Sequence, residues 1–198
     1  MVVGTDFRFG YQRRGDYRML ELLAEKYGYE VEVVDKIQEN GRDISSTFVR
    51  EEIVAGNIEH ANQLLGYDFF TEGTVIHGRR MGKEILGIPT INLIPSEDKL
   101  LPPFGVYITK TNWQGRDYPG ITNVGCKPTV EGDYPIGVET HLFDVSEDLY
   151  GEEVRVSFLK HVRKEQRFSS LEALKEQMQH DIACGRVYFN MGKGVQKN

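Results

Sequence analysis

The sequence is poor in the features that mark secreted, membrane-embedded or nucleic-acid-binding proteins. Its two cysteines, Cys126 and Cys184, offer no disulfide framework, so a reducing cytoplasm is expected. No apolar run approaches the ~20 residues of a membrane-spanning helix. Acidic residues outnumber basic ones, 30 to 24, which argues against nucleic-acid binding by bulk electrostatics. We therefore expect a cytoplasmic protein that binds neither nucleic acid nor membrane; its oligomeric state stays open.

What is present indicates an ordinary globular protein of one large or two small domains, with 39% hydrophobic and 27% charged residues. The first third predicts alternating strands and helices. A helix is expected from Asp16, its cap, to Gly28, and a strand over 30–34. Two more helices are expected over 45–55 and up to Gly66. This order is typical of part of a Rossmann-like α/β nucleotide-binding sheet.

Beyond residue 67 the spacing of apolar residues changes from the helical pattern to every second position. Val138, Thr140 and Leu142, for example, alternate with Glu139 and His141. Short strands of this kind, separated by Pro, Gly and Asn turns, predict a closed antiparallel barrel and hence an α+β protein overall.

A last helix is predicted to begin with a capping box at Ser169 and Glu172. Its apolar stripe is expected to comprise Leu171, Leu174, Met178 and Ile182. The polar stretch 191–198 is predicted to be a flexible tail.

The segment 73–92, GTVIHGRRMGKEILGIPTIN, combines an apolar strand, a basic glycine-rich loop and a hydroxyl–amide pair. Glycines let backbone N–H groups approach phosphate oxygens. Thr90 and Asn92 carry neutral oxygens of the kind that Mg²⁺ accepts beside phosphates and water. The pattern is not a Walker loop, which needs Ser or Thr after Gly-Lys. On pattern alone, a hairpin with a glycine-rich solvent loop fits equally well.

Three motifs together resemble those of riboflavin kinases. The first is G-x-V-x-x-G followed by LGIPT-x-N within 73–92, and the second is the E-T-H strand at 139–141. The third is DLYG at 148–151, followed by FLKHVRKEQRF at 158–168. They occur in the family's order over roughly residues 68–187, which makes coincidence improbable.

The resemblance implies a six-stranded Greek-key β-barrel with a C-terminal helix. It also implies Mg²⁺- and ATP-dependent phosphorylation of the riboflavin 5′-hydroxyl to FMN. The implied roles are catalytic base for Glu139; ATP binding for Gly78, Gly82, Thr90 and Asn92; metal binding for Thr90 and Asn92; and flavin binding for Arg163 and Phe168. The resemblance leaves open whether Lys83 or Glu84 meets the ATP phosphates, and positive charge favours Lys83.

Each role has an ordinary structural alternative. An alternating strand turns Glu139 away from the barrel core, where it can be a solvated strand glutamate or face a ligand groove. Thr90 and Asn92 fit a turn capped by side chains. Phe168 can pack on the flavin ring or only against the last helix. Asn123 begins a turn similar to the family's N-x-G-x-K-P-T.

Upstream, VGTDFRFG at 3–10, RGD at 14–16 and ISSTFVR at 44–50 resemble the later part of bacterial FMN adenylyltransferase domains. In bifunctional FAD synthetases this domain precedes the kinase. None of the five histidines lies in its H-x-G-H motif.

The resemblance therefore implies a truncated adenylyltransferase domain over 1–67 and a kinase domain over 68–190, with FAD formation absent. The alternatives are a fragment of a bifunctional FAD synthetase that makes FAD when full length, or a non-catalytic flavin- or nucleotide-binding module.

Overall fold

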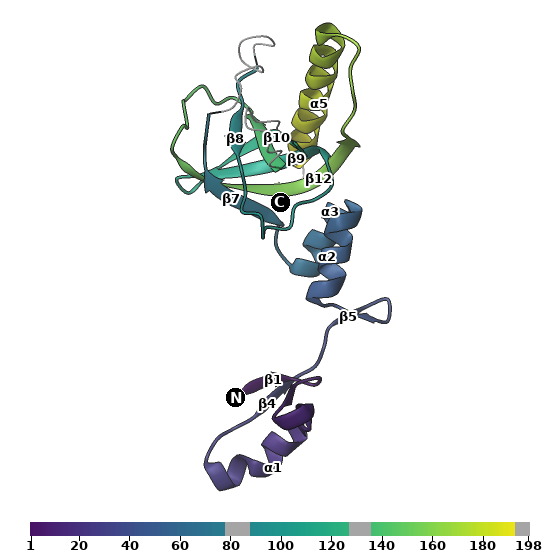
Figure 1. Cartoon of the computed structure of the whole chain (residues 1–198), viewed down its shortest axis with the longest axis vertical. Helices are drawn as coiled ribbons and strands as arrows, with labels where there is room; N and C mark the ends of the chain where they lie inside the picture. The colour runs from purple at the N-terminus through teal and green to yellow at the C-terminus, as the bar shows by residue number, and fades with distance from the viewer. Residues whose placement is uncertain (78–87, 127–135, 193–198) are drawn as a thin grey trace. The chain divides into compact units, whose positions relative to one another are not determined.

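The computed structural model describes residues 1–77, 88–126 and 136–192 (Figure 1). The chain forms two compact units, Met1–Phe48 and Val49–Asn198. This division lies before the boundary expected near residue 67, because the helices that precede the barrel pack with it. The boundary near residue 67 between an adenylyltransferase domain and a kinase domain stays a prediction.

The first unit contains a short parallel pair, β1 (Val2–Gly4) with β4 (Glu32–Val34), joined through the helix α1 (Tyr17–Tyr27). Asp16 caps α1 by accepting a hydrogen bond from the backbone N–H of Met19, and Gly28 ends it in the left-handed conformation. The predicted helix ends are therefore confirmed. The remaining elements are β2 (Arg8–Phe9), η1 (Tyr11–Arg13), β3 (Gly15–Asp16), β5 (Gln38–Glu39) and β6 (Arg42–Asp43).

Little of this first unit is buried. Within residues 1–48, only Gly15 and Phe48 are buried, and apolar side chains such as Leu22 and Ile37 are exposed. A strand pair and one helix bury too little apolar surface to form a core of their own.

The division between the units falls within α2 (Ser46–Ala55), which is followed by α3 (Ile58–Leu65); both helices lie close to their predicted bounds. Asn62 joins α3 to the sheet: its Nδ2 donates to the Phe158 carbonyl at 2.8 Å, and its Oδ1 accepts from the Phe69 N–H at 2.8 Å.

Six antiparallel strands then form the predicted barrel. They are β7 (Phe70–Thr74), β8 (Ile91–Leu93), β9 (Gly105–Trp113), β10 (Arg116–Cys126), β11 (Ile136–Leu142) and β12 (Glu153–Lys164). The strand order is β7-β12-β9-β10-β11-β8. Because β12 returns beside β9 after the β9-β10-β11 meander, the connection is a Greek key. A bridge between Ile76 and Asn92 joins the two edges and nearly closes the barrel.

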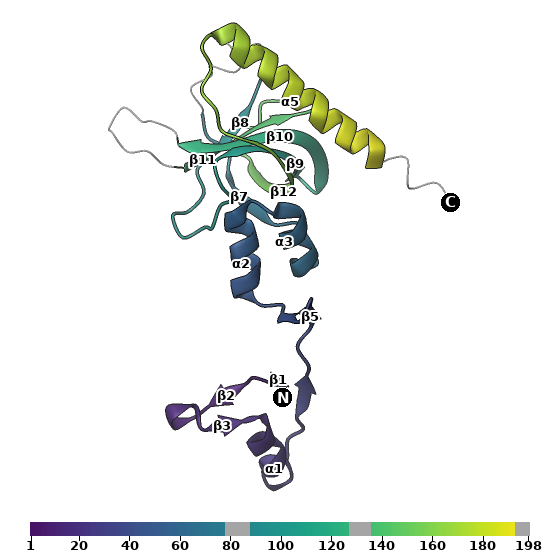
Figure 2. The same cartoon turned by 90° about the vertical axis from the view of Figure 1, so that its right-hand side faces the viewer.

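The helix α5 (Leu171–Gly192) lies across the outside of the barrel (Figure 2). Its Ile182, Tyr188 and Phe189 pack on an apolar cluster of the sheet that includes Val106 and Ile121. This burial, worth ~25 cal/mol per Å² of apolar surface, holds the helix in place. Across the described part of the chain, no helix is long and apolar enough to span a bilayer.

Three details of α5 differ from the prediction. Its cap is Ser170, not Ser169: the Ser170 Oγ accepts from the Ala173 N–H at 3.1 Å. Leu171 is 52% exposed, because the first turn projects beyond the sheet. Met191 and Gly192 belong to the helix; residues 193–198 lie outside the described part.

Candidate active site

A row of paired residues crosses the outer face of the barrel at Glu139. Asn92 of β8 lies opposite Glu139 of β11, which lies opposite Asn123 of β10. Asn123 in turn pairs with Val106 of β9, and Val106 pairs with Arg163 of β12. Directly opposed residues point to the same side of a sheet. Glu139 therefore stands between two asparagines, away from the barrel interior, as the strand alternation predicted.

Thr90 contacts this carboxylate directly. Its Oγ1 donates a hydrogen bond to Glu139 Oε1 at 2.7 Å, although the two residues are 49 positions apart. Thr90 and Glu139 are half-buried, whereas Asn92 is only 4% exposed. The structure thus brings together three of the residues predicted from the sequence.

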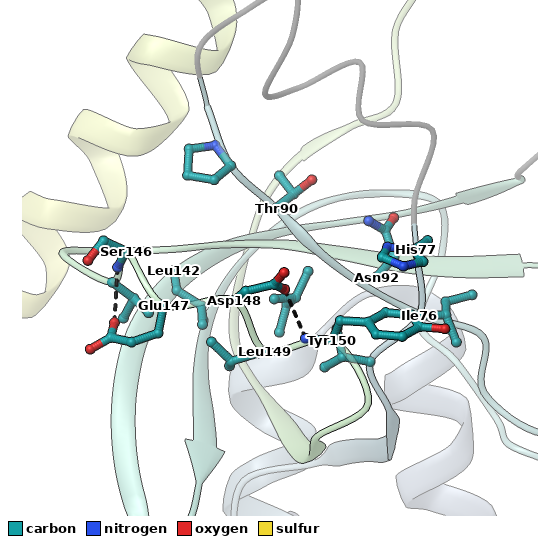
Figure 3. A pocket seen from close by; sticks show the side chains of 14 residues that line it. Ile76, His77, Thr90, Asn92, Leu142, Ser146, Glu147, Asp148, Leu149 and Tyr150 are labelled. Carbon is teal, nitrogen blue, oxygen red and sulfur yellow. Dashed lines mark hydrogen bonds between the residues drawn. The ribbon is translucent and has the colours of Figure 1, made fainter.

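A cavity of about 510 Å³ opens beside Thr90 and Asn92 (Figure 3). It is lined by residues 75–77, 89–92 and 145–150 together with Leu142. Glu139 does not line the cavity, but its hydrogen-bond partner Thr90 does. Thr90 therefore links the cavity to the carboxylate.

Stacked aromatic rings and acidic side chains are the main features of the cavity lining. The rings of His77 and Tyr150 stack with centroids 3.6 Å apart and planes 11° from parallel. Asp148 Oδ1 accepts from the Tyr150 N–H at 3.0 Å, which fixes the turn. Among the described lining residues, the side chains with a formal charge are acidic, Glu147 and Asp148. An anionic ligand here would need a cation to offset this charge.

The donor set fits a cation held jointly with a ligand. The described residues contain no group of three His, Cys, Asp or Glu side chains able to hold a metal ion alone. Thr90 and Asn92 offer neutral oxygens, and Mg²⁺ commonly takes its remaining ligands from phosphates and water. Gly78, Gly82 and Lys83, the other predicted ATP-binding residues, lie outside the described residues.

Arg163 lies at the far end of the row with Phe168 near it, and neither residue lines the cavity. The Arg163 guanidinium pairs with Asp181 of α5 at 2.8 Å and lies 5.7 Å from the centroid of the Phe168 ring. Further along, the Glu165 carboxylate lies against β10: a Cβ on Gly125 would be 2.8 Å from Glu165 Oε1. The segment after β12 therefore passes beside Asn123.

Comparison with known proteins decides the family. The family described as riboflavin kinase, or flavokinase, matches residues 65–189, and the family described as FAD synthetase matches residues 1–48. The chain belongs to the riboflavin kinase family. The three kinase motifs recognised in the sequence fall within the first match.

The relatives are longer proteins that carry two named activities. A bifunctional riboflavin kinase/FMN adenylyltransferase of Pseudomonas fluorescens is 39% identical over 187 residues, 94% of this chain and 60% of that protein. The protein of the same name from Escherichia coli K12 is 39% identical over 194 residues, 98% of this chain and 61% of that protein. This chain thus spans about three fifths of these relatives.

A solved structure, described as a macrolide-efflux protein from Streptococcus pneumoniae, is similar over 92% of this chain and 58% of that chain. Its TM-score is 0.81 and its sequence identity 31%. The likeness supports the fold, and the activity in that description remains a statement about that protein.

Sequence reasoning on this riboflavin kinase family member missed two features. His77 lacks the spacing of a metal ligand, yet its ring stacks on Tyr150 of the DLYG motif. Asp181 was not singled out, because one carboxylate on an amphipathic helix carries no local signal. The tyrosine of the DLYG motif was the one indication in the sequence that His77 has an aromatic partner. Nothing in the sequence pointed to Asp181.

Proposed function

We propose that this chain is a riboflavin kinase, which transfers the γ-phosphoryl group of ATP to the 5′-hydroxyl of riboflavin and yields FMN and ADP. The observation that carries the proposal is the position of Glu139. It is hydrogen-bonded to the cavity-lining Thr90 at 2.7 Å on one side and paired with Asn123 on the other. A carboxylate between two binding regions suits a reaction between two substrates.

Glu139 is the general base in this proposal. As the new bond between the alcohol oxygen and phosphorus forms and the bond to ADP breaks, the hydroxyl proton passes to the carboxylate. The Thr90 hydroxyl, by donating to Oε1, orients the carboxylate. Most of the remaining catalysis is positioning and charge stabilisation.

The cavity is the proposed ATP side. Its volume of about 510 Å³ falls in the range of small-ligand pockets. The stacked His77 and Tyr150 rings offer a flat wall for a base. Thr90 and Asn92 would hold Mg²⁺, which when bound neutralises phosphate charge; Lys83 would add a positive charge from the glycine loop.

The opposite end of the row is the proposed flavin side. Asn123 and Arg163 lie on either side of Val106, which α5 covers, and the segment that carries Glu165 and Phe168 runs beside them. Amide and guanidinium groups next to an aromatic ring suit a planar, partly polar ring system. In this arrangement the flavin hydroxyl approaches Glu139 from the side opposite to ATP.

A second activity, FMN adenylylation, is favoured by the match of residues 1–48 to the FAD synthetase family. We expect this chain by itself to make no FAD, because only Gly15 and Phe48 are buried in that unit. A unit without a core does not hold catalytic groups in fixed geometry.

The test is incubation of the purified chain with riboflavin, ATP and Mg²⁺, followed by chromatographic separation of FMN and FAD. FMN alone supports the proposal. FAD as well would overturn our expectation for the first unit. If riboflavin and ATP both bind and neither product forms, the chain is a binding module and the proposed activity is wrong.

A further inference from the structure

Asp181 is the one charged side chain that is buried among the described residues, at 2% exposure. It accepts hydrogen bonds from Arg163 Nε at 3.1 Å and Nη2 at 2.8 Å, and from Gln177 Nε2 at 2.9 Å. Such a carboxylate is costly to bury unless each oxygen is paired, and here both are.

The partner of this carboxylate stands beside the proposed flavin side. Arg163 is opposite Val106, and its Nη1 donates to the Lys164 carbonyl at 3.2 Å. The same guanidinium lies 5.7 Å from the Phe168 ring centroid. The Arg163 guanidinium therefore contacts both ends of the segment 164–168: the backbone carbonyl of Lys164 and the ring of Phe168.

Two irregularities in β12 precede this contact. The pairing of β12 with β9 shifts register between Phe158 and Lys160 and again between His161 and Arg163. Bulges of this kind bend a strand and redirect its side chains. After the second shift β12 stays paired with β9 at Arg163 and Lys164, and the ion pair with Asp181 adds a side-chain anchor on α5 to this backbone pairing.

From these contacts we infer that Asp181 is a positioning residue for flavin binding. It orients Arg163 and, through it, holds the segment 164–168 beside Asn123 and Glu139. The inference rests on the proposed function for the identity of the ligand. It assigns Arg163 a supporting role, in which the guanidinium shapes the binding surface because Asp181 fixes two of its nitrogens.

The chain contains a matched control. Arg186 of α5 pairs with Asp144 through both nitrogens, at 3.1 and 2.8 Å, and so also ties this helix to the barrel. The side chains of this second pair are exposed, 46% for Arg186 and 76% for Asp144. If α5 only needs to be attached, both pairs should matter alike.

The experiment compares Asp181→Asn with Asp144→Asn in the full chain. Riboflavin binding is followed by quenching of flavin fluorescence, and KM is measured separately for riboflavin and ATP. For Asp181→Asn we expect the riboflavin Kd and KM to rise about tenfold or more, since one partner of a buried charge pair is lost, while the ATP KM stays within about twofold. For Asp144→Asn both values should stay within about twofold.

Arg163→Lys keeps the positive charge but cannot present the planar fork. It should reproduce the selective rise in riboflavin Kd, and it decides the question if Asp181→Asn does not fold by circular dichroism. Equal changes for both substrates, equal effects of the two Asp→Asn variants, or no effect of Arg163→Lys would overturn the inference. A wild-type chain that binds riboflavin without making FMN would refute the proposed activity, yet the Kd comparison would still test Asp181.

Discussion

Replacing Glu139 with glutamine removes the group that is proposed to act as the base. The amide has the shape of the carboxylate, and its carbonyl oxygen can still accept the Thr90 hydroxyl that now donates at 2.7 Å. Because Asn92 stays buried and the cavity lining is unchanged, the ATP KM should stay within about twofold of the wild-type value. The amide cannot take up the alcohol proton at neutral pH, so the loss falls on turnover.

General-base catalysis contributes roughly 10²–10⁴ in rate, or about 2.7–5.4 kcal/mol of barrier. We therefore expect kcat for FMN formation to fall by about that factor in Glu139→Gln. The matched control is Glu72→Gln on β7, an exposed glutamate that pairs with Arg155 at 3.0 Å, and its kcat should be unchanged. A Glu139→Gln enzyme that keeps kcat within about threefold of wild type would refute the assignment of the base.

Three further predictions concern the barrel and its helix. In Gly185→Ala, the new Cβ would lie 2.8 Å from Phe143 Cζ. Overpacking of about 1–3 kcal/mol should then exceed the helix-propensity gain of about 1 kcal/mol and lower the thermal midpoint; a higher midpoint would contradict this contact. The buried Thr111 hydroxyl has no hydrogen-bond partner among residues the structure describes, whereas Thr122 bonds two neighbouring threonine hydroxyls at 2.7 Å. In urea titrations Thr111→Val should thus be neutral or stabilising and Thr122→Val destabilising by about 1–3 kcal/mol, and the reverse order would disprove the argument. Burial raises the pKa of Tyr107 to about 12; the folded state therefore keeps a proton that the unfolded state loses near pH ~10, and stability should fall by up to about 2.7 kcal/mol between pH ~10 and ~12. Tyr107→Phe should abolish that slope, and an unchanged slope would show that another group causes it.

Local sequence signals predicted the secondary structure well where the cause is local. Asp16 and Gly28 end α1 through a side-chain cap and a left-handed glycine, which depend on neighbouring residues alone. The alternation around Glu139 predicted its side of the sheet, because side chains on a strand alternate whatever lies beyond it. The order of the three motifs was likewise sufficient to predict the kinase family that the comparisons show.

Predictions failed where packing chose between equivalent local patterns. Ser169 and Ser170 can both cap a helix, and the structure uses Ser170. Leu171 fits an apolar stripe by spacing, yet the sheet does not reach the first turn of α5 and leaves it exposed. Helical periodicity predicts a face, but the neighbouring surface determines how far along the helix that face is covered.

The sequence by itself determined the helix caps, the face on which Glu139 lies and the family, because these follow from adjacent residues or from motif order. Only the tertiary structure decided which side chains meet. Thr90 reaches Glu139 across 49 positions because β8 pairs with β11. Arg163 finds Asp181 because α5 packs over the strand next to its own. Contacts of this kind depend on strand order and helix placement, which arise from burial of the whole apolar surface and not from any short segment.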